Sequence, residues 1–164
     1  MNNFINNISK PYSWALLISL VALIIALFLE YIINLYPCHL CIIQRYAYCI
    51  TLILSLLAFI YKYKKIISIF ICFSMIGTAG IAFWHVGIEL HWWLPSLSCS
   101  GIEKDIGSFT EELKNNLLET SSAGCDIKSP KFLGITLVQW SLIYIVIGTI
   151  INIKLTYKVL KNEA

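Results

Sequence analysis

Four long apolar runs constrain this chain more than any other feature of its sequence. They cover residues of about 14–35, 42–61, 66–86 and 134–153. A helix needs about 20 mostly apolar residues to cross the hydrocarbon core of a bilayer, and each run comes close to that length. Backbone amides have no water partners in lipid, and no run alternates as a barrel strand does. Each run therefore predicts a membrane-spanning helix.

The composition agrees with a chain that lies mostly in a membrane. Of its 164 residues, 59% are apolar and 13% are charged, and the mean hydropathy is +0.78. A soluble domain of this length is far less apolar. We therefore expect an all-α integral membrane protein, a bundle of four transmembrane helices that forms a single membrane domain over residues 1–164.

The distribution of basic residues predicts which way the bundle faces. The net charge is only +3, and no basic stripe with interleaved aromatic residues suggests nucleic acid as a partner. Lysines instead gather near the ends of the runs: Lys10, then Lys62, Lys64 and Lys65, then Lys154, Lys158 and Lys161. The positive-inside rule places these positions, and both termini, in the cytoplasm. The opposite side then holds a short loop, about 36–41, and a long loop, about 87–133.

The long loop contains a helical pattern. Apolar residues recur there at spacings of three and four, between charged residues: Ile102, Ile106, Phe109, Leu113 and Leu117. This pattern predicts a short amphipathic helix on the membrane surface, and Ser108 with Glu111 resembles a capping box that would start or restart it. An ordinary solvated loop helix is the alternative.

Cys38 and Cys41 form a C-x-x-C motif where the short loop enters the second span. Cys41 is expected near the N-terminus of that helix, where exposed amides and the helix dipole stabilise a thiolate. Arg45, four residues later, brings a cation to the same face. We therefore expect Cys41 to be the activated sulfur.

The same C-x-x-C spacing also serves zinc sites and structural disulfides. His39, His85 or His91 could contribute zinc ligands, but the sequence has no second C-x-x-C and no H-x-x-x-H. We therefore expect no bound metal. An inert structural disulfide is a further alternative.

Cys99 and Cys125 bracket the amphipathic segment and lie among serines and glycines. A disulfide between them would close a long, accessible loop that an incoming thiolate could attack, although a purely structural bridge is also possible. Two pairs on one side of the membrane suggest a relay in which electrons enter at the loop pair and reach the C-x-x-C. Cys49 and Cys72 fall inside apolar runs, and we expect them only to pack.

Several motifs together resemble the disulfide bond formation protein B (DsbB) family of quinone reductases. They are Pro37-Cys38-His39-Leu40-Cys41 with Gln44-Arg45, Trp84-His85-Val86-Gly87-Ile88-Glu89 ahead of Pro95 and Cys99, and Cys125 followed by Phe132-Leu133-Gly134-Ile135 and Gln139-Trp140. The resemblance runs from about the first span to the fourth. It implies a multi-pass protein of the bacterial inner membrane.

The resemblance implies a role for each cysteine of the relay. Cys99 would form a mixed disulfide with a periplasmic, thioredoxin-like (DsbA-like) thiol oxidase. Cys125 would then attack or be linked to Cys38, and Cys41 would be left as the thiolate that faces a membrane quinone, ubiquinone or menaquinone. The net result is an oxidised partner and a quinol.

The resemblance also implies that Arg45 and His85 bind the quinone. Arg45 carries a charge that suits a neighbouring thiolate and a quinone oxygen, whereas an arginine that only reaches the lipid interface is the alternative. His85 could donate a hydrogen bond or relay a proton. Gln44 departs from the family, in which an acidic residue often precedes the arginine. Glu30, the one ionisable residue of the first run, is left without a role.

Two other classes of protein remain as alternatives. A noncatalytic tetraspan scaffold would use the external cysteines as two structural disulfides, and its thiols would be inert. A zinc-binding transporter module would hold stoichiometric metal.

Overall fold

The computed structural model describes residues 10–61, 64–94, 125 and 129–162, and long helices dominate this part of the chain. The helices are α2 (Pro11–Tyr31), α3 (His39–Ile60), α4 (Lys64–Glu89) and α6 (Leu137–Asn162). Each is long and apolar enough to cross a membrane. The predicted all-α bundle of four spans is therefore confirmed, while the amphipathic helix expected around residues 102–117 lies outside the described residues.

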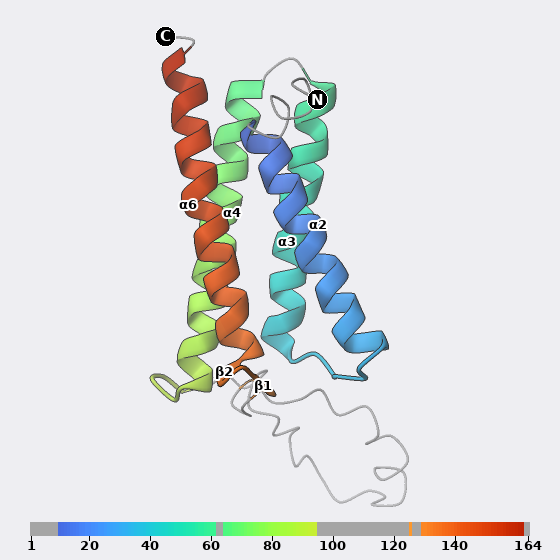
Figure 1. Cartoon of the computed structure of the whole chain (residues 1–164). Coiled ribbons are helices and arrows are strands. Elements are labelled where there is room, and N and C mark those ends of the chain that lie inside the picture. The colour runs from blue at the N-terminus through green and yellow to red at the C-terminus, as the bar shows by residue number, and fades with distance from the viewer. Residues whose placement is uncertain (1–9, 62–63, 95–124, 126–128, 163–164) are drawn as a thin grey trace, which may run out of the picture.

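The helices pack so that α3 lies between α2 and α4, and α4 lies between α3 and α6 (Figure 1). The start of α2, the start of α4 and the end of α6 lie at one end of the bundle (Figure 1). The connection between α2 and α3, the end of α4 and a small hairpin lie at the other, which we call the hairpin end (Figure 1). Basic residues such as Lys10, Lys64 and Lys161 therefore lie opposite the C-x-x-C motif.

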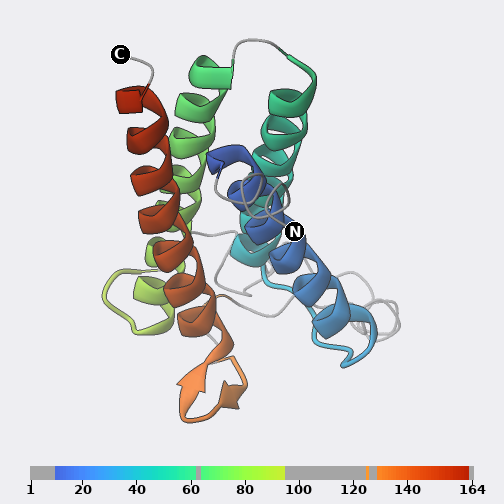
Figure 2. The same cartoon turned by 45° about the horizontal axis from the view of Figure 1, so that its top comes forward.

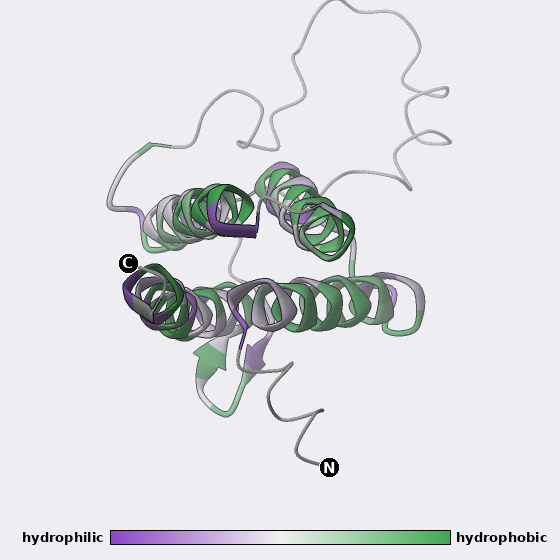
Figure 3. Cartoon of the chain, turned by 90° about the horizontal axis from the view of Figure 1, so that it is seen from above, coloured by the Kyte–Doolittle hydropathy of each residue, from purple (hydrophilic) through white to green (hydrophobic). Residues whose placement is uncertain are grey.

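The outer faces of the helices are apolar (Figure 3). Large side chains on each helix are more than half exposed: Ile24, Phe28, Ile50, Ile53, Ile66, Phe70, Phe73 and Ile147. Residues such as Ile71, Met75 and Ile145 are fully buried between the helices. Such an apolar exterior suits lipid and not water. The chain is therefore a multi-pass membrane protein.

Helices α2 and α6 touch along only part of their length. Away from the hairpin end, the Asn152 side-chain amide donates to the Pro11 carbonyl at 2.8 Å, and the Tyr144 hydroxyl donates to the Ile18 carbonyl at 2.9 Å. A methyl group at Gly148 would meet the Ile18 side chain, so the helices approach closely here. Toward the hairpin end they separate, and side chains of both helices line a cavity.

A two-stranded antiparallel hairpin precedes α6 (Figure 2), and the sequence analysis did not predict it. In it, β1 (Lys131–Phe132) pairs with β2 (Ile135–Thr136). Leu133 and Gly134 have φ angles of 56° and 83°. Positive φ at both central residues is typical of a type I′ turn, which matches the twist of the flanking strands.

Helix α6 starts with a capping box. The Gln139 amide N–H donates to Thr136 Oγ1 at 3.3 Å, and the Thr136 amide N–H donates to Gln139 Oε1 at 3.4 Å. These bonds satisfy amides that a helix start leaves unpaired. The helix therefore begins at Leu137 and not near residue 134 as predicted, and it continues past the predicted end near 153 to Asn162.

The first span was also predicted with shifted bounds. Helix α2 begins at Pro11, whose missing amide donor and fixed φ suit the first helical turn. It ends at Tyr31, and Asn34 adopts a left-handed conformation with φ of 56°. Because that conformation cannot continue a right-handed helix, the predicted extension to Leu35 is wrong.

Candidate functional site

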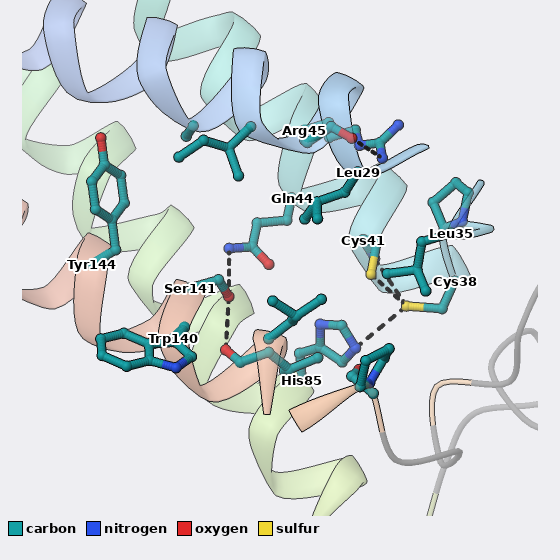
Figure 4. Close-up of a pocket in the computed structure, with 18 of the residues that line it drawn as sticks. Leu29, Leu35, Cys38, Cys41, Gln44, Arg45, His85, Trp140, Ser141 and Tyr144 are labelled. Carbon is teal, nitrogen blue, oxygen red and sulfur yellow. Dashed lines mark hydrogen bonds between the residues drawn. The ribbon is translucent and has the colours of Figure 1, made fainter. Parts of the chain in front are cut away.

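The two cysteines of the C-x-x-C motif lie at the start of α3 (Figure 4). Cys38 caps the helix, because its sulfur accepts a hydrogen bond from the Cys41 amide at 3.3 Å. The two sulfurs are 2.8 Å apart, with the Cys38 thiol as donor. Both are unbridged thiols. The sequence prediction that Cys41 lies in the first turn of a helix is confirmed.

His85 reaches this pair from α4 (Figure 4). Its Nε2 lies 3.3 Å from the sulfur of Cys38, and the residue is only 2% exposed. Among the described residues, its Nδ1 has no hydrogen-bond partner. A buried ring nitrogen without a partner is costly, so a ligand in the site could gain by bonding to it.

Cys125 comes to the same place from the segment that precedes the hairpin. It is buried and packs with Cys38, Leu40 and Ile88. It also hydrogen bonds to the side chain of Cys38. The structure thus brings Cys38, Cys41 and Cys125 together, whereas Cys99 lies outside the described residues.

The thiol of Cys38 lies just outside the spanning part of α3. The hydrogen bond with Cys125 lowers its pKa, but the bond that it donates to Cys41, burial and the charge of Cys41 outweigh this and raise the pKa of Cys38 to about 12. Cys38 is therefore protonated at neutral pH. Its donation stabilises negative charge on Cys41, where the helix N-terminus already favours a thiolate.

Arg45 lies one turn further along α3 and forms an ion pair with Glu30 of α2. It also donates to the Ala26 carbonyl at 3.2 Å, so both contacts fix it against α2. The sequence analysis gave Glu30 no role, although an ionisable residue inside an apolar run was the signal that could have found it. These contacts hold Arg45 beside the cavity.

A cavity of about 540 Å³ connects these groups (Figure 4). Its apolar walls come from α2 and α6, through residues such as Ala22, Ile25, Leu29 and Val138. Its polar groups come from several elements: Cys38, Cys41, Gln44, Arg45, Tyr48, His85, Cys125, Ser141 and Tyr144. The cavity is mostly apolar, with a few convergent polar groups, as is typical of sites for small apolar ligands.

Gln44 is buried between α3 and α6 beside the cavity. Its side-chain amide donates to the Ser141 hydroxyl at 3.5 Å, and that hydroxyl donates to the Val138 carbonyl (Figure 4). Gln44 is neutral, so it brings no negative charge beside Arg45. In this chain Glu30 is therefore the carboxylate that pairs with Arg45.

Glu89, the last residue of α4, is a buried structural residue whose role the sequence did not predict. Its carboxylate is 1% exposed and accepts hydrogen bonds from the Thr136 hydroxyl at 2.8 Å and the Ser129 amide at 3.0 Å. It therefore ties the end of α4 to the segment that follows Cys125. A charged residue directly after an apolar run was the available signal, but sequence alone could not supply its partners.

Trp93 packs against the last turns of α4. It stacks on Trp84 with 5.0 Å between ring centroids and donates from Nε1 to the Trp84 carbonyl at 3.1 Å. A methyl group at Gly87 would overlap its indole ring. This packing lies against the cluster that holds Cys38 and Cys125.

Cys49 and Cys72 do not line the cavity.

Comparison with known proteins is consistent with this arrangement. Residues 10–155 match the family model described as disulfide bond formation protein DsbB. The chain is 32% identical to disulfide bond formation protein B of Herminiimonas arsenicoxydans, over 85% of this chain and 89% of that protein. It is 30% identical to the protein of the same name from Cupriavidus metallidurans, over 76% of this chain and 78% of that protein.

Proposed function

Because the chain belongs to the disulfide bond formation protein DsbB family, we propose that it passes electrons from a periplasmic thiol oxidase to a membrane quinone through two cysteine pairs. At the coarser level, it is a bacterial membrane oxidoreductase of disulfide bond formation. The observation that carries the proposal is the position of Cys41. Its sulfur lines an apolar cavity with Arg45 and His85 while it touches Cys38, which in turn contacts Cys125.

The cavity fits a quinone. Its apolar walls suit a ring and an isoprenoid tail, and α2 and α6 diverge at this end. Arg45 offers a cation, and the Nδ1 atom of His85 lacks a partner among the described residues. When bound, a quinone supplies an acceptor for two electrons and two protons. Arg45 and His85 would orient it beside the sulfur of Cys41.

The relay balances as two disulfide exchanges followed by oxidation of a dithiol. The partner's two thiols would reduce a disulfide between Cys99 and Cys125, so the partner leaves as a disulfide. The two thiols of Cys99 and Cys125 would then reduce a disulfide between Cys38 and Cys41. The Cys38–Cys41 dithiol would return to a disulfide by giving up two electrons and two protons to the bound quinone.

The neighbours of Cys38 and Cys41 suit this last exchange. Cys38 keeps its proton at neutral pH and donates it toward Cys41, so Cys41 is the sulfur able to carry negative charge. Cys125 lies against Cys38, which makes Cys38 the sulfur that it would attack. Attack at Cys38 releases Cys41 as the leaving thiolate, and a thiolate stabilised at a helix N-terminus leaves readily.

The position of the basic residues supports an orientation. Lys10, Lys64, Lys154 and Lys161 lie at or toward the end of the bundle opposite the cysteines. By the positive-inside rule, that end would face the cytoplasm and the hairpin end the periplasm of the bacterial inner membrane. The cysteines would then meet an oxidising compartment, where disulfides persist.

The test is a steady-state assay of the purified chain with a reduced thioredoxin-like oxidase and a soluble quinone. We expect quinol formation that requires the partner and is abolished in Cys41→Ser. The double variant Cys49→Ser with Cys72→Ser is the matched control and should retain the activity. If quinone is not reduced, or if Cys41→Ser reduces it as fast as the wild type, the proposed enzyme activity is contradicted.

A further inference from the structure

Three side chains that commonly bind metal meet at the base of the cavity. The sulfurs of Cys38 and Cys41 and a ring nitrogen of His85 all lie within 4.8 Å of one another. They come from two helices, because α3 supplies the cysteines and α4 supplies the histidine (Figure 4). The sequence argued against zinc because it has no second C-x-x-C and no H-x-x-x-H, but the fold brings His85, one of the histidines that could serve as a ligand, to the cysteine pair.

We propose that the reduced chain binds Zn²⁺ through Cys38, Cys41, His85 and Cys125. The four donors make a Cys₃His set, which is one of the common tetrahedral zinc sites. Thiolate and imidazole donors suit zinc better than magnesium or calcium, which prefer oxygen.

Two distances between the donor atoms can be compared with those that a zinc ion requires. With zinc–sulfur bonds of about 2.3 Å and zinc–nitrogen bonds of about 2.0–2.1 Å, ligand atoms in a tetrahedral site lie roughly 3.5–3.8 Å apart. Cys38 Sγ and His85 Nε2 are 3.3 Å apart, and the two sulfurs of the motif are 2.8 Å apart. The sulfur pair must therefore open by about 1 Å, which a side-chain rotation can supply.

The surroundings of the motif also suit a metal-bound thiolate. The Cys41 amide already donates a hydrogen bond to the sulfur of Cys38. Such bonds to a ligand atom orient it and support metal affinity. Arg45 interacts electrostatically with Cys41, and it would offset the negative charge that three thiolates leave on a zinc site.

Cys125 packs against Cys38, but its sulfur is not among the donor atoms that all lie within 4.8 Å of one another, so it must move to complete the set. Its side chain is 2% exposed, packs against Cys38 and hydrogen bonds to it, and it interacts electrostatically with Cys41. Binding through all four residues requires all three sulfurs as thiolates, so protons are released from the protonated thiols as Zn²⁺ binds.

Metal and disulfide compete for the same sulfurs. Oxidation of Cys38 and Cys41 to a disulfide removes two of the donors, so only the reduced chain binds zinc. Where the chain works as the proposed relay, zinc would hold the centre reduced and stop electron transfer until a chelator removes the metal.

Metal titration of the full chain in detergent tests this proposal. The chain is first stripped with a chelator and reduced with a phosphine, which does not bind zinc as a thiol reductant would. Co²⁺ is then added, followed by Zn²⁺. We expect one Co²⁺ per chain with intense thiolate-to-cobalt charge-transfer absorption, which one equivalent of Zn²⁺ removes. The oxidised wild-type chain should show no such absorption, and this control needs no substitution.

Variants assign the ligands. Loss of a residue that only supports a metal ligand weakens metal binding by up to about 100-fold. Cys38→Ser, Cys41→Ser and His85→Gln each remove a ligand and should weaken zinc binding by more than that. Cys125→Ser should lower the charge-transfer intensity by about a third, because one of three sulfur donors is lost. The double variant Cys49→Ser with Cys72→Ser should match the wild type.

Absence of the absorption in the reduced wild type, or equal binding by the oxidised chain, would overturn the proposal. Unchanged intensity in Cys125→Ser would remove Cys125 from the site. The readout needs neither quinone nor partner protein, so its failure is distinct from failure of the proposed function.

Discussion

The carboxylate of Glu89, at the end of α4, accepts a hydrogen bond from the hydroxyl of Thr136 in the hairpin at 2.8 Å. The Ser129 amide bonds to the other carboxylate oxygen. Glu89 and Thr136 are 47 residues apart in the chain, and the segment between them carries Cys125. Glu89 therefore helps to hold Cys125 against Cys38.

Replacing Glu89 should loosen the position of Cys125. Glu89→Gln removes the negative charge. It also turns an amide N–H group toward the Thr136 hydroxyl or the Ser129 amide, which are themselves donors. Hydrogen bonds to charged groups contribute about 1.5–3 kcal/mol, so labelling of Cys125 by a maleimide should accelerate about 10-fold or more. Labelling is followed on the Cys125 peptide by mass spectrometry. Lys131→Ala, at an exposed position of the same hairpin, is the control and should leave the rate unchanged.

The pH at which Cys38 ionises should depend on Cys41. Because the bond to Cys41 and the charge of Cys41 both raise the pKa of Cys38, Cys41→Ala should lower that pKa from about 12 toward the ordinary value of 9.0. Alkylation of Cys38 measured against pH gives the midpoint for the reduced wild type and the variant. If Cys41→Ala only made Cys38 more accessible, the alkylation rate would change at every pH, but the midpoint of its pH dependence would stay the same. An unmoved midpoint would contradict the assigned hydrogen bond.

Arg45 and Glu30 should affect quinone use unequally. Arg45→Gln removes a charged donor at the cavity, so the KM for quinone should rise about 10–100-fold, the equivalent of 1.5–3 kcal/mol. Glu30→Gln keeps the cation and its bond to the Ala26 carbonyl of α2, and its effect should be only a few-fold because the ion pair is partly exposed.

The control for this pair is Tyr46→Phe, on the exposed side of the same helix, which should leave the KM unchanged. Equal effects of the Arg45 and Glu30 variants would show that the ion pair, and not the cation, matters. An unchanged KM in Arg45→Gln would remove Arg45 from the site.

The contact between Gly87 and Trp93 should be sensitive to a single methyl group. Gly87→Ala overlaps the indole ring and should cost about 1–3 kcal/mol through strain. For a chain of this size that lowers the midpoint of thermal unfolding in detergent by about 2–4 °C per kcal/mol. Gly80→Ala meets no atom within 4 Å and should be neutral or slightly stabilising, since alanine favours a helix. Equal stability of both variants would contradict the contact.

Periodicity and length were enough to predict the four spans, because lipid allows few alternatives for an apolar run. They could not predict the hairpin before α6. Its strands have two residues each, too short to show a pattern, and Leu133 is an unusual residue for a left-handed turn. Thr136 and Gln139 have the spacing of a capping box, which is the local signal in the sequence for the start of α6.

The site could be predicted only in part. Cys38, Cys41 and Arg45 are close in sequence, so their common position at the start of one helix followed from spacing alone. The approach of His85 and Cys125 depends on packing between helices, and only the family resemblance suggested it. The pairing of Glu30 with Arg45 was not predicted, because it needs the relative rotation of α2 and α3, which no local pattern encodes.

A single turnover of the chain alone tests the relay most directly. The fully reduced protein, with Cys49→Ser and Cys72→Ser, is mixed with excess soluble quinone in the absence of any partner, and thiols and quinol are counted. We predict two thiols lost for each quinol formed, a disulfide that joins Cys38 to Cys41 or Cys125, and no quinol when Cys41 is alanine. Quinol formation that persists in Cys41→Ala, or no quinol from the intact relay, would contradict electron transfer through this cysteine.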